Sequence, residues 1–177
     1  MKPAAMAQAT CIELPTEVMT LSASAMQPLQ TLLSRFGLQL VLVADTDIIS
    51  GSYWGECEAG LIGDFLYARP DTPLHSVLHE ASHYVCMDAQ RRAALHRDAG
   101  GDYTEENAVC YLQILLSDQV SGFGQARMFT DMDAWGYTFR LGSARAWFEQ
   151  EAQDAQQWLL NAGLIDESMQ PTWQVRA

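Results

Sequence analysis

The sequence has few basic residues and lacks the long apolar runs that cross membranes. Lysine and arginine together number 10, against 22 aspartates and glutamates, so the formal net charge of the 177 residues is −12. A surface of this sign repels nucleic-acid phosphates and anionic lipid headgroups, so we expect no nucleic-acid partner and no membrane partner. No run of about 18 apolar residues is present, and the first twenty residues contain no continuous apolar segment of the secretory-signal type. We therefore expect a cytoplasmic protein in which residues 1–20 form a loose N-terminal arm.

Cysteine is also scarce, and the cysteines lie far apart. The chain has Cys11, Cys57, Cys86 and Cys110, and no two of them form a CxxC pair. This spacing argues against a cysteine-rich structural zinc site. Because no secretory signal is recognised, we expect all four to be free thiols.

The rest of the composition is that of a globular protein, with 49% hydrophobic and 18% charged residues. Neither an internal repeat nor a low-complexity linker interrupts it, so we expect one domain over residues 1–177. Periodicity predicts a helix over 26–36, a buried strand over 38–44, and two strands within 50–69 that turn near Ala59–Gly60. Because strands come early and helices late, the sequence predicts an α+β fold.

Helical patterns continue from residue 72 to the end of the chain. Thr72 and Pro73 are a typical helix start, and the helix that follows can continue as far as Gly100. Its predicted core-facing apolar stripe consists of Leu74, Val77, Leu78, Ala81 and Val85. Thr104 is expected to cap the next helix, which ends before a loop at 121–124. A short helix over 131–139 and a long helix from Ser143 complete the prediction.

One motif in the helix after Pro73 carries chemistry. His79-Glu80-Ala81-Ser82-His83 has the HExxH spacing. Residues four apart lie on the same face of a helix, so both imidazoles can bind one ion, as zinc requires. Glu80 lies one step around the helix, where its carboxylate can reach a metal-bound water. The alternative is an ordinary helix that carries two half-exposed histidines.

A catalytic zinc ion needs a third protein ligand and one open position. The metzincin position, six residues after His83, is occupied by alanine, which excludes that class. His75 lies too far along the helix axis to share an ion with both His79 and His83, and we expect it on the helix surface, with a place in the cleft as the alternative. His96 is a weak candidate, and Cys86, one turn after His83, is expected to be a buried thiol.

The next helix offers two adjacent glutamates, Glu105 and Glu106, as the third ligand. Glu105 is in line with an apolar stripe and Glu106 with a more polar face. The stripe consists of Ala108, Val109, Leu112 and Leu116, and the polar face of Cys110, Gln113 and Ser117. Because an inward-facing carboxylate is costly to bury unless it binds a cation or another partner, we favour Glu105 and keep Glu106 as the alternative. Without a metal, both glutamates would only complement the positive end of their helix.

These residues together resemble the gluzincin clan, the thermolysin-like zinc metallopeptidases. Glu105 follows His83 by 22 positions, close to the spacing used in that clan. The run Glu105-Glu106-Asn107-Ala108, with Leu115-Leu116 further along, also resembles the small intracellular members, the minimal gluzincins. The resemblance covers roughly residues 60–118. It implies a zincin-like fold in which an N-terminal helix and a small sheet pack on the HExxH helix, with the glutamate-bearing helix and C-terminal helices beside it.

The resemblance also implies zinc-dependent hydrolysis of peptide bonds. His79, His83 and Glu105 would hold Zn²⁺, and Glu80 would take the proton of the zinc-bound water. Tyr137 is our candidate for the donor that stabilises the transition state, with a packed core tyrosine as the alternative. A peptide or protein substrate would pair with an open strand at 61–68 by β-augmentation.

Two departures from the gluzincin pattern support a second hypothesis. Thermolysin-like proteins usually carry an aspartate four residues after the ligand glutamate, where it orients a histidine, but that position here is Val109. No motif assigns the transition-state donor. The second hypothesis is therefore a catalytically inactive, zinc-stabilised protein-interaction domain on the same scaffold, and a helix without metal is the third. The sequence predicts no oligomeric state.

Overall fold

A small mixed sheet forms one side of the molecule. The computed structural model describes residues 18–21, 23–53, 55 and 57–177. Within these residues the strands are β1 (Gln39–Leu42), β2 (Gly60–Ile62) and β3 (Phe65–Ala68). β3 is the central strand, with β1 parallel to it on one side and β2 antiparallel on the other. Leu66 faces Leu40 across one ladder and Leu61 across the other.

Helices make up the rest of the fold, so the predicted α+β class is confirmed. In chain order they are α1 (Ala23–Ser34), α2 (Leu74–Cys86), α3 (Ala89–Ala93), α4 (Tyr103–Ser117), α5 (Gly124–Trp135), α6 (Ala144–Gln150) and α7 (Gln153–Asn161). No helix in the described part of the chain is both long and apolar enough to cross a membrane.

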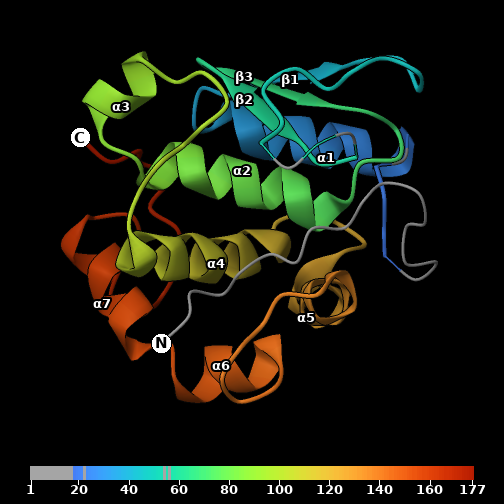
Figure 1. Ribbon diagram of the computed structural model, residues 1–177. Coiled ribbons are helices and arrows are strands. Elements are labelled where there is room, and N and C mark those ends of the chain that lie inside the picture. The colour runs from blue at the N-terminus through green and yellow to red at the C-terminus, as the bar shows by residue number, and fades with distance from the viewer. Residues whose placement is uncertain (1–17, 22, 54, 56) are drawn as a thin grey trace.

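Helix α2 is the central element of the fold. Figure 1 shows the sheet on one side of α2 and α4 on the other, with α5, α6 and α7 around α4. The apolar stripe predicted for this helix is confirmed, because each member is at most 1% exposed. Its members are Leu74, Val77, Leu78, Ala81 and Val85. Every residue of α2 except His83 is buried, so the HExxH face is also turned toward protein and not toward solvent.

The hairpin turns later in the chain than the sequence suggested. Strands β2 and β3 are joined at Gly63–Asp64, whereas the expected turn was Ala59–Gly60. Gly63 has φ +58°, a left-handed conformation that suits a turn glycine. A glycine is needed at position 60 for a different reason. A Cβ there would lie 2.1 Å from the carbonyl oxygen of Ser50. That glycine permits a close approach of two backbone segments inside the sheet.

Residues 61–68 therefore do not form one open strand, and that prediction is wrong. β3 is paired on both sides, by β1 and by β2. The other side of β2 carries isolated bridges from Ser52 to Gly60 and from His96 to Ile62. A peptide could add to this edge only by displacing these contacts. The second bridge places His96 at the edge of the sheet, where it is exposed and pairs with Ile62 through its backbone.

Three helix boundaries differ from the predictions. α2 ends at Cys86, and Asp88 caps the separate helix α3 by accepting the N–H of Arg91. Asp102, not Thr104, caps α4 by accepting the N–H of Glu105 at 2.9 Å. Asp102 competes better because it has extended backbone angles directly after two glycines with positive φ.

The later helices are also divided differently. α5 begins at Gly124 and ends at Trp135, so it starts before the expected range 131–139 and leaves Tyr137 in the segment that follows. The predicted long helix from Ser143 is two helices, α6 and α7, separated at Glu151 and Ala152. Ser143 caps the first of them by accepting the N–H of Ala146.

The segment just before α1 is tied to the fold. The Leu21 N–H donates to Thr72, and the Leu74 N–H donates to Met19, each at 2.9 Å. The Met19 N–H donates to the buried Asp131 carboxylate at 2.9 Å. The expected loose arm over 1–20 is therefore wrong for residues 18–20, and residues 1–17 lie outside the described residues.

The expectation of free thiols holds for two of the cysteines. Cys86 and Cys110 are free and buried. Cys57 is disulfide-bonded, so that part of the prediction is wrong. Cys11 lies outside the described residues.

Candidate metal centre

The candidate site lies where α2 and α4 pack together. Figure 1 shows the two helices side by side and running in opposite directions, so the second half of α2 lies next to the first half of α4. His79 and His83 are one turn apart and project toward α4. Glu106, in the first turns of α4, meets both of them. In the described part of the chain this is the only group of three or more His, Cys, Asp or Glu side chains arranged to hold a metal ion.

The two histidine nitrogens and the Glu106 carboxylate form a compact triangle, in which one atom from each residue lies within 4.8 Å of the others. His79 Nε2 lies 3.1 Å from His83 Nε2. Glu106 Oε1 lies 3.4 Å from His79 Nε2, and Glu106 Oε2 lies 3.3 Å from His83 Nε2. A tetrahedral zinc site with bonds of about 2.0–2.1 Å has ligand–ligand edges of about 3.3–3.4 Å. The spacing of the two nitrogens and the nearest carboxylate oxygens is close to these edges, and no fourth side chain from the described residues joins the group.

The structure corrects the third ligand, because Glu106 and not Glu105 faces the histidines. Glu105 is 5% exposed, as expected of a residue on an inward stripe. The cations that bind the Glu105 carboxylate are arginine guanidinium groups and not a metal ion. Arg91 donates to both carboxylate oxygens of Glu105, at 2.7 and 2.9 Å, and Arg176 donates at 3.2 Å. A buried carboxylate with this set of donors is satisfied without a metal ion.

The apolar stripe of α4 predicted the wrong ligand, because α4 has no solvent-exposed face along most of its length. Every residue from Ala108 to Ser117 is buried. On a helix surrounded by protein, polar side chains on one face do not indicate solvent. Glu106, Cys110 and Gln113 form such a face, and it is directed at α2.

Gln113 orients His79. Its Oε1 lies 2.6 Å from His79 Nδ1, and its Nε2 donates to the sulfur of Met128 at 3.6 Å. Because an amide oxygen only accepts, the His79 proton resides on Nδ1, and Nε2 presents a lone pair toward Glu106 and His83. This is the arrangement that metal-ligating histidines usually have, with an amide in place of the aspartate. The sequence feature that indicates this role is a glutamine on the polar face of α4, the face that also carries Glu106.

His83 is held in the neutral form that a ligand needs. Burial lowers the pKa of His83 well below its ordinary value, and the nearby His79 and Arg91 lower it further. Its side chain is 12% exposed. Its Nδ1 is buried and has no hydrogen-bond partner among the described residues. Thus only one of the two histidines has an orienting partner in the described part of the chain.

Glu80 has the environment expected of a proton acceptor beside a metal. It is 9% exposed, and the described residues provide no hydrogen bond or ion pair for its carboxylate. Burial raises the pKa of Glu80 well above its ordinary value, and the carboxylates of Glu58 and Glu106 raise it further. A divalent cation held by Glu106 and the histidines would oppose this shift by favouring the ionised carboxylate.

Glu58 is a second buried carboxylate near the site, and no sequence pattern predicts it. It is 8% exposed, and Trp135 Nε1 donates to it at 2.9 Å. Burial raises its pKa, while the Trp135 hydrogen bond and His79 lower it. Glu58 lies in the irregular segment before β2, where neither helical nor strand periodicity distinguishes a buried glutamate from a solvated one.

His75 and Tyr137 lie behind His79. His75 is fully buried, so its expected place on the helix surface is wrong, and burial lowers its pKa to about 3. The Tyr137 hydroxyl lies 3.5 Å from His75 Nδ1, and it also forms a hydrogen bond with Gln113. Burial raises the pKa of Tyr137 well above its ordinary value.

The two free cysteines border the site without forming part of the triangle. Cys110 Sγ lies 4.0 Å from Glu106 Oε1, one turn along α4. Counted from Glu106, Cys110 occupies the position at which thermolysin-like proteins usually have aspartate. Burial raises the pKa of the Cys110 thiol and of the Cys86 thiol, so both are protonated small side chains, as expected for Cys86.

Comparisons of the chain with protein-family models, curated proteins and solved structures find no match.

Proposed function

We propose that this chain is a zinc-dependent peptidase that hydrolyses peptide bonds with a metal-activated water. The observation that supports it best is the triangle of His79, His83 and Glu106, in which the two Nε2 atoms lie 3.1 Å apart and each lies 3.3 to 3.4 Å from one oxygen of the Glu106 carboxylate, close to the ligand spacing of a tetrahedral zinc site. Two imidazoles and one carboxylate with an open fourth position are the ligand set of catalytic zinc in several peptidases.

The residues around the triangle have distinct roles in this proposal. Zinc bound there would polarise the scissile carbonyl and lower the pKa of a bound water toward 7. Glu80, adjacent in sequence to a ligand but not itself a ligand, accepts the proton of the water and delivers it to the leaving amine. Gln113 holds His79 in the tautomer that presents Nε2. The Tyr137 hydroxyl bonds to Gln113 and lies 3.5 Å from His75 Nδ1, and Tyr137 is our candidate for the donor that stabilises the transition state.

One observation favours the alternative, a zinc-stabilised interaction domain without turnover. The strand edge expected to bind substrate is already paired, by β1 on one side of β3 and by two bridges along β2. A peptidase would need another place to hold an extended peptide. An interaction domain needs no such groove beside the metal.

The experiment compares the wild type with Glu80→Gln, measuring zinc per chain and cleavage of a peptide library. We expect about one zinc per chain in both proteins, because Glu80 is not a ligand. We expect cleavage by the wild type only, with a loss of about 10²–10⁴-fold or more in the variant, the range typical of a lost general base. Equal cleavage by both proteins would refute the role of Glu80. Zinc without cleavage in the wild type would establish the interaction domain instead.

A further inference from the structure

Two arginines beside the candidate metal centre have no place in the chemistry above. Arg91 comes from α3 and Arg176 from the segment after α7, yet both bind the carboxylate of Glu105. Glu105 is the immediate neighbour of the candidate ligand Glu106. Since successive residues on a helix differ by about 100° in direction, the side bound by the arginines determines which side Glu106 faces.

Arg176 is itself fixed to the end of α2, and Arg91 to the segment before α4. The Arg176 N–H donates to the Val85 carbonyl at 2.9 Å, and its guanidinium donates to the Cys86 carbonyl at 3.3 Å. Arg91 also donates to the Ala99 carbonyl. Glu105 is therefore linked through Arg176 to the last turn of the helix that carries His79 and His83. This link connects the two helices that supply the ligands.

The backbone before α4 is shaped for the same contact. Gly101 has φ +101°, and a Cβ at this position would lie 2.8 Å from Glu105 Oε1. The Glu105 carboxylate thus lies directly over the glycine, on its way to Arg91. Asp102 then caps the helix by accepting the Glu105 N–H. The first turn of α4 is therefore fixed both through the Glu105 backbone N–H and through the Glu105 side chain.

We propose that Arg91 and Arg176 are positioning residues that select Glu106, and not Glu105, as the metal ligand. By binding Glu105 they fix the rotation of the first turn of α4 against α2 and leave Glu106 facing His79 and His83. This inference rests on the proposed function, because it takes the triangle to be a metal site. It explains why, of the two adjacent glutamates, Glu106 is the metal ligand and Glu105 is not.

The test measures metal binding, independently of peptide cleavage. The proteins are the wild type, the Arg91→Gln/Arg176→Gln double variant, Glu105→Gln and Glu106→Gln. Arg145→Gln is the matched control, because its ion pair with Glu149 is exposed and lies on α6, away from the site. Zn²⁺ affinity is measured by competition with a chromophoric chelator, and the visible absorption bands of bound Co²⁺ report the ligand geometry. Thermal unfolding of each metal-free protein reports stability separately.

We expect Glu106→Gln to lose metal binding and Glu105→Gln to retain it with reduced affinity. We expect the double arginine variant to bind Zn²⁺ at least about tenfold more weakly, in the range seen when groups that orient ligands are removed. Its Co²⁺ bands should shift, and a purely structural loss of stability would not shift them. Arg145→Gln should match the wild type in both readouts. Where the double variant does not fold, the single variant Arg176→Gln, which loses the guanidinium bonds to Glu105 and Cys86 but keeps both Arg91 bonds to Glu105, is used instead.

Three results would overturn the inference. Unchanged affinity and an unchanged Co²⁺ spectrum in the folded arginine variants would show that they position nothing. Loss of metal in Glu105→Gln as complete as in Glu106→Gln would make Glu105 a ligand. Absence of metal from the wild type would overturn the proposed function together with this inference, so the two failures are distinguishable.

Discussion

Gln113 shows how a single buried side chain can define a ligand. It is fully buried, and its oxygen meets His79 Nδ1 at 2.6 Å, which fixes the ring orientation and the tautomer. His83 has no such partner among the described residues. The orientation of the site therefore depends more on Gln113 than it would if both histidines were held.

Gln113→Leu keeps the volume of the side chain but removes the acceptor. We expect metal affinity to fall by about 10–100-fold, the usual effect of losing an orienting partner. The stability of the metal-free protein should fall by about 1–3 kcal/mol, because the His79 N–H remains buried without an acceptor. Chelator competition and thermal unfolding measure the two effects. Gln157→Leu, on the exposed face of α7, is the control and should alter neither by a comparable amount.

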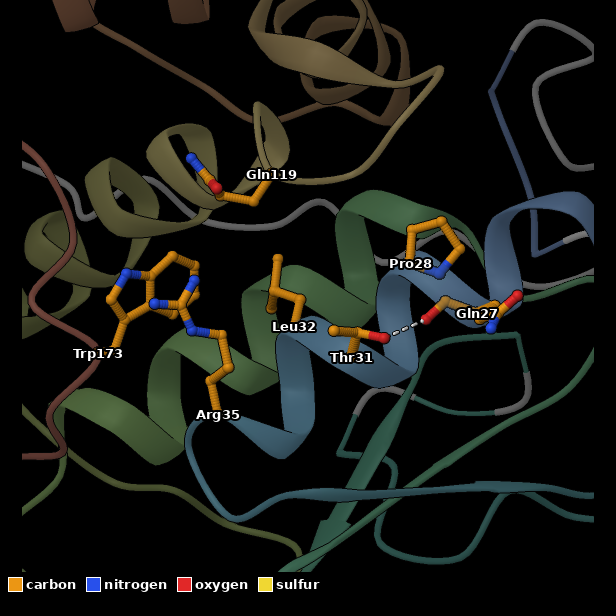
Figure 2. Close-up of a pocket in the computed structure, with 7 residues that line it drawn as sticks. All are labelled: Gln27, Pro28, Thr31, Leu32, Arg35, Gln119 and Trp173. Atoms are coloured by element: carbon orange, nitrogen blue, oxygen red, sulfur yellow. Dashed lines mark hydrogen bonds between the residues drawn. The ribbon is translucent and has the colours of Figure 1, made fainter.

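One pocket on the surface is separate from these residues. Figure 2 shows it between α1, the end of α4 and the C-terminal segment, with a volume of about 340 Å³. Arg35 stacks on Trp173, with its guanidinium carbon 3.2 Å from the ring centroid. None of the candidate ligands lines it. The groove therefore plays no part in the chemistry proposed above.

At the scale of elements, two helix caps allow the role of α4 to be separated from general stability. Asp102 caps α4, which carries Glu106, and Ser143 caps α6, which carries no candidate ligand. Both caps use one side-chain oxygen to accept a backbone N–H. One cap is a carboxylate and the other a hydroxyl, and the two start different helices.

Asp102→Ala and Ser143→Ala should each destabilise the protein by about 1 kcal/mol. For a protein of this size, that corresponds to a melting temperature about 2–4 °C lower. We expect only Asp102→Ala to weaken metal binding also, because it loosens the turn that positions Glu106. Differential scanning fluorimetry and chelator competition make the comparison. Equal metal affinity in the two variants would show that the start of α4 does not control the ligand.

On the scale of the whole molecule, the candidate metal centre joins two helices from the middle of the fold. α2 packs under the sheet, and α4 packs against α5 and α7 as well as α2. A metal ion that bridges α2 and α4 would bind the folded chain only. Binding should therefore raise the free energy of unfolding of the entire protein.

Removal of metal with a chelator should lower the melting temperature of the wild type. At a metal concentration about 1,000 times the Kd, the stabilisation is about 4 kcal/mol. At about 2–4 °C per kcal/mol, the expected decrease is about 8–16 °C. Glu106→Gln is the control, and its melting temperature should not respond to the chelator. A wild type that responds neither to chelator nor to added zinc would support the third hypothesis, a histidine-bearing helix without metal.

The sequence by itself determined the features that follow from local periodicity. HExxH on a helical segment places His79 and His83 on one face whatever surrounds the helix, because positions i and i+4 are neighbours in any α-helix. The apolar stripe of α2 and the order of strands and helices likewise predicted the buried side of that helix and the α+β class. Both predictions are confirmed.

Only the tertiary structure decided which residues complete the site. The choice of Glu106 over Glu105 and the places of Gln113 and Glu58 depend on contacts between segments far apart in the chain. Arg91 and Arg176 bind Glu105 across 14 and 71 residues, and Gln113 meets His79 across 34. A helix that is buried on all sides offers several inward faces, and its own periodicity cannot rank them. Packing against α2 and the arginines sets the rotation, and that rotation turns Glu106 toward the histidines.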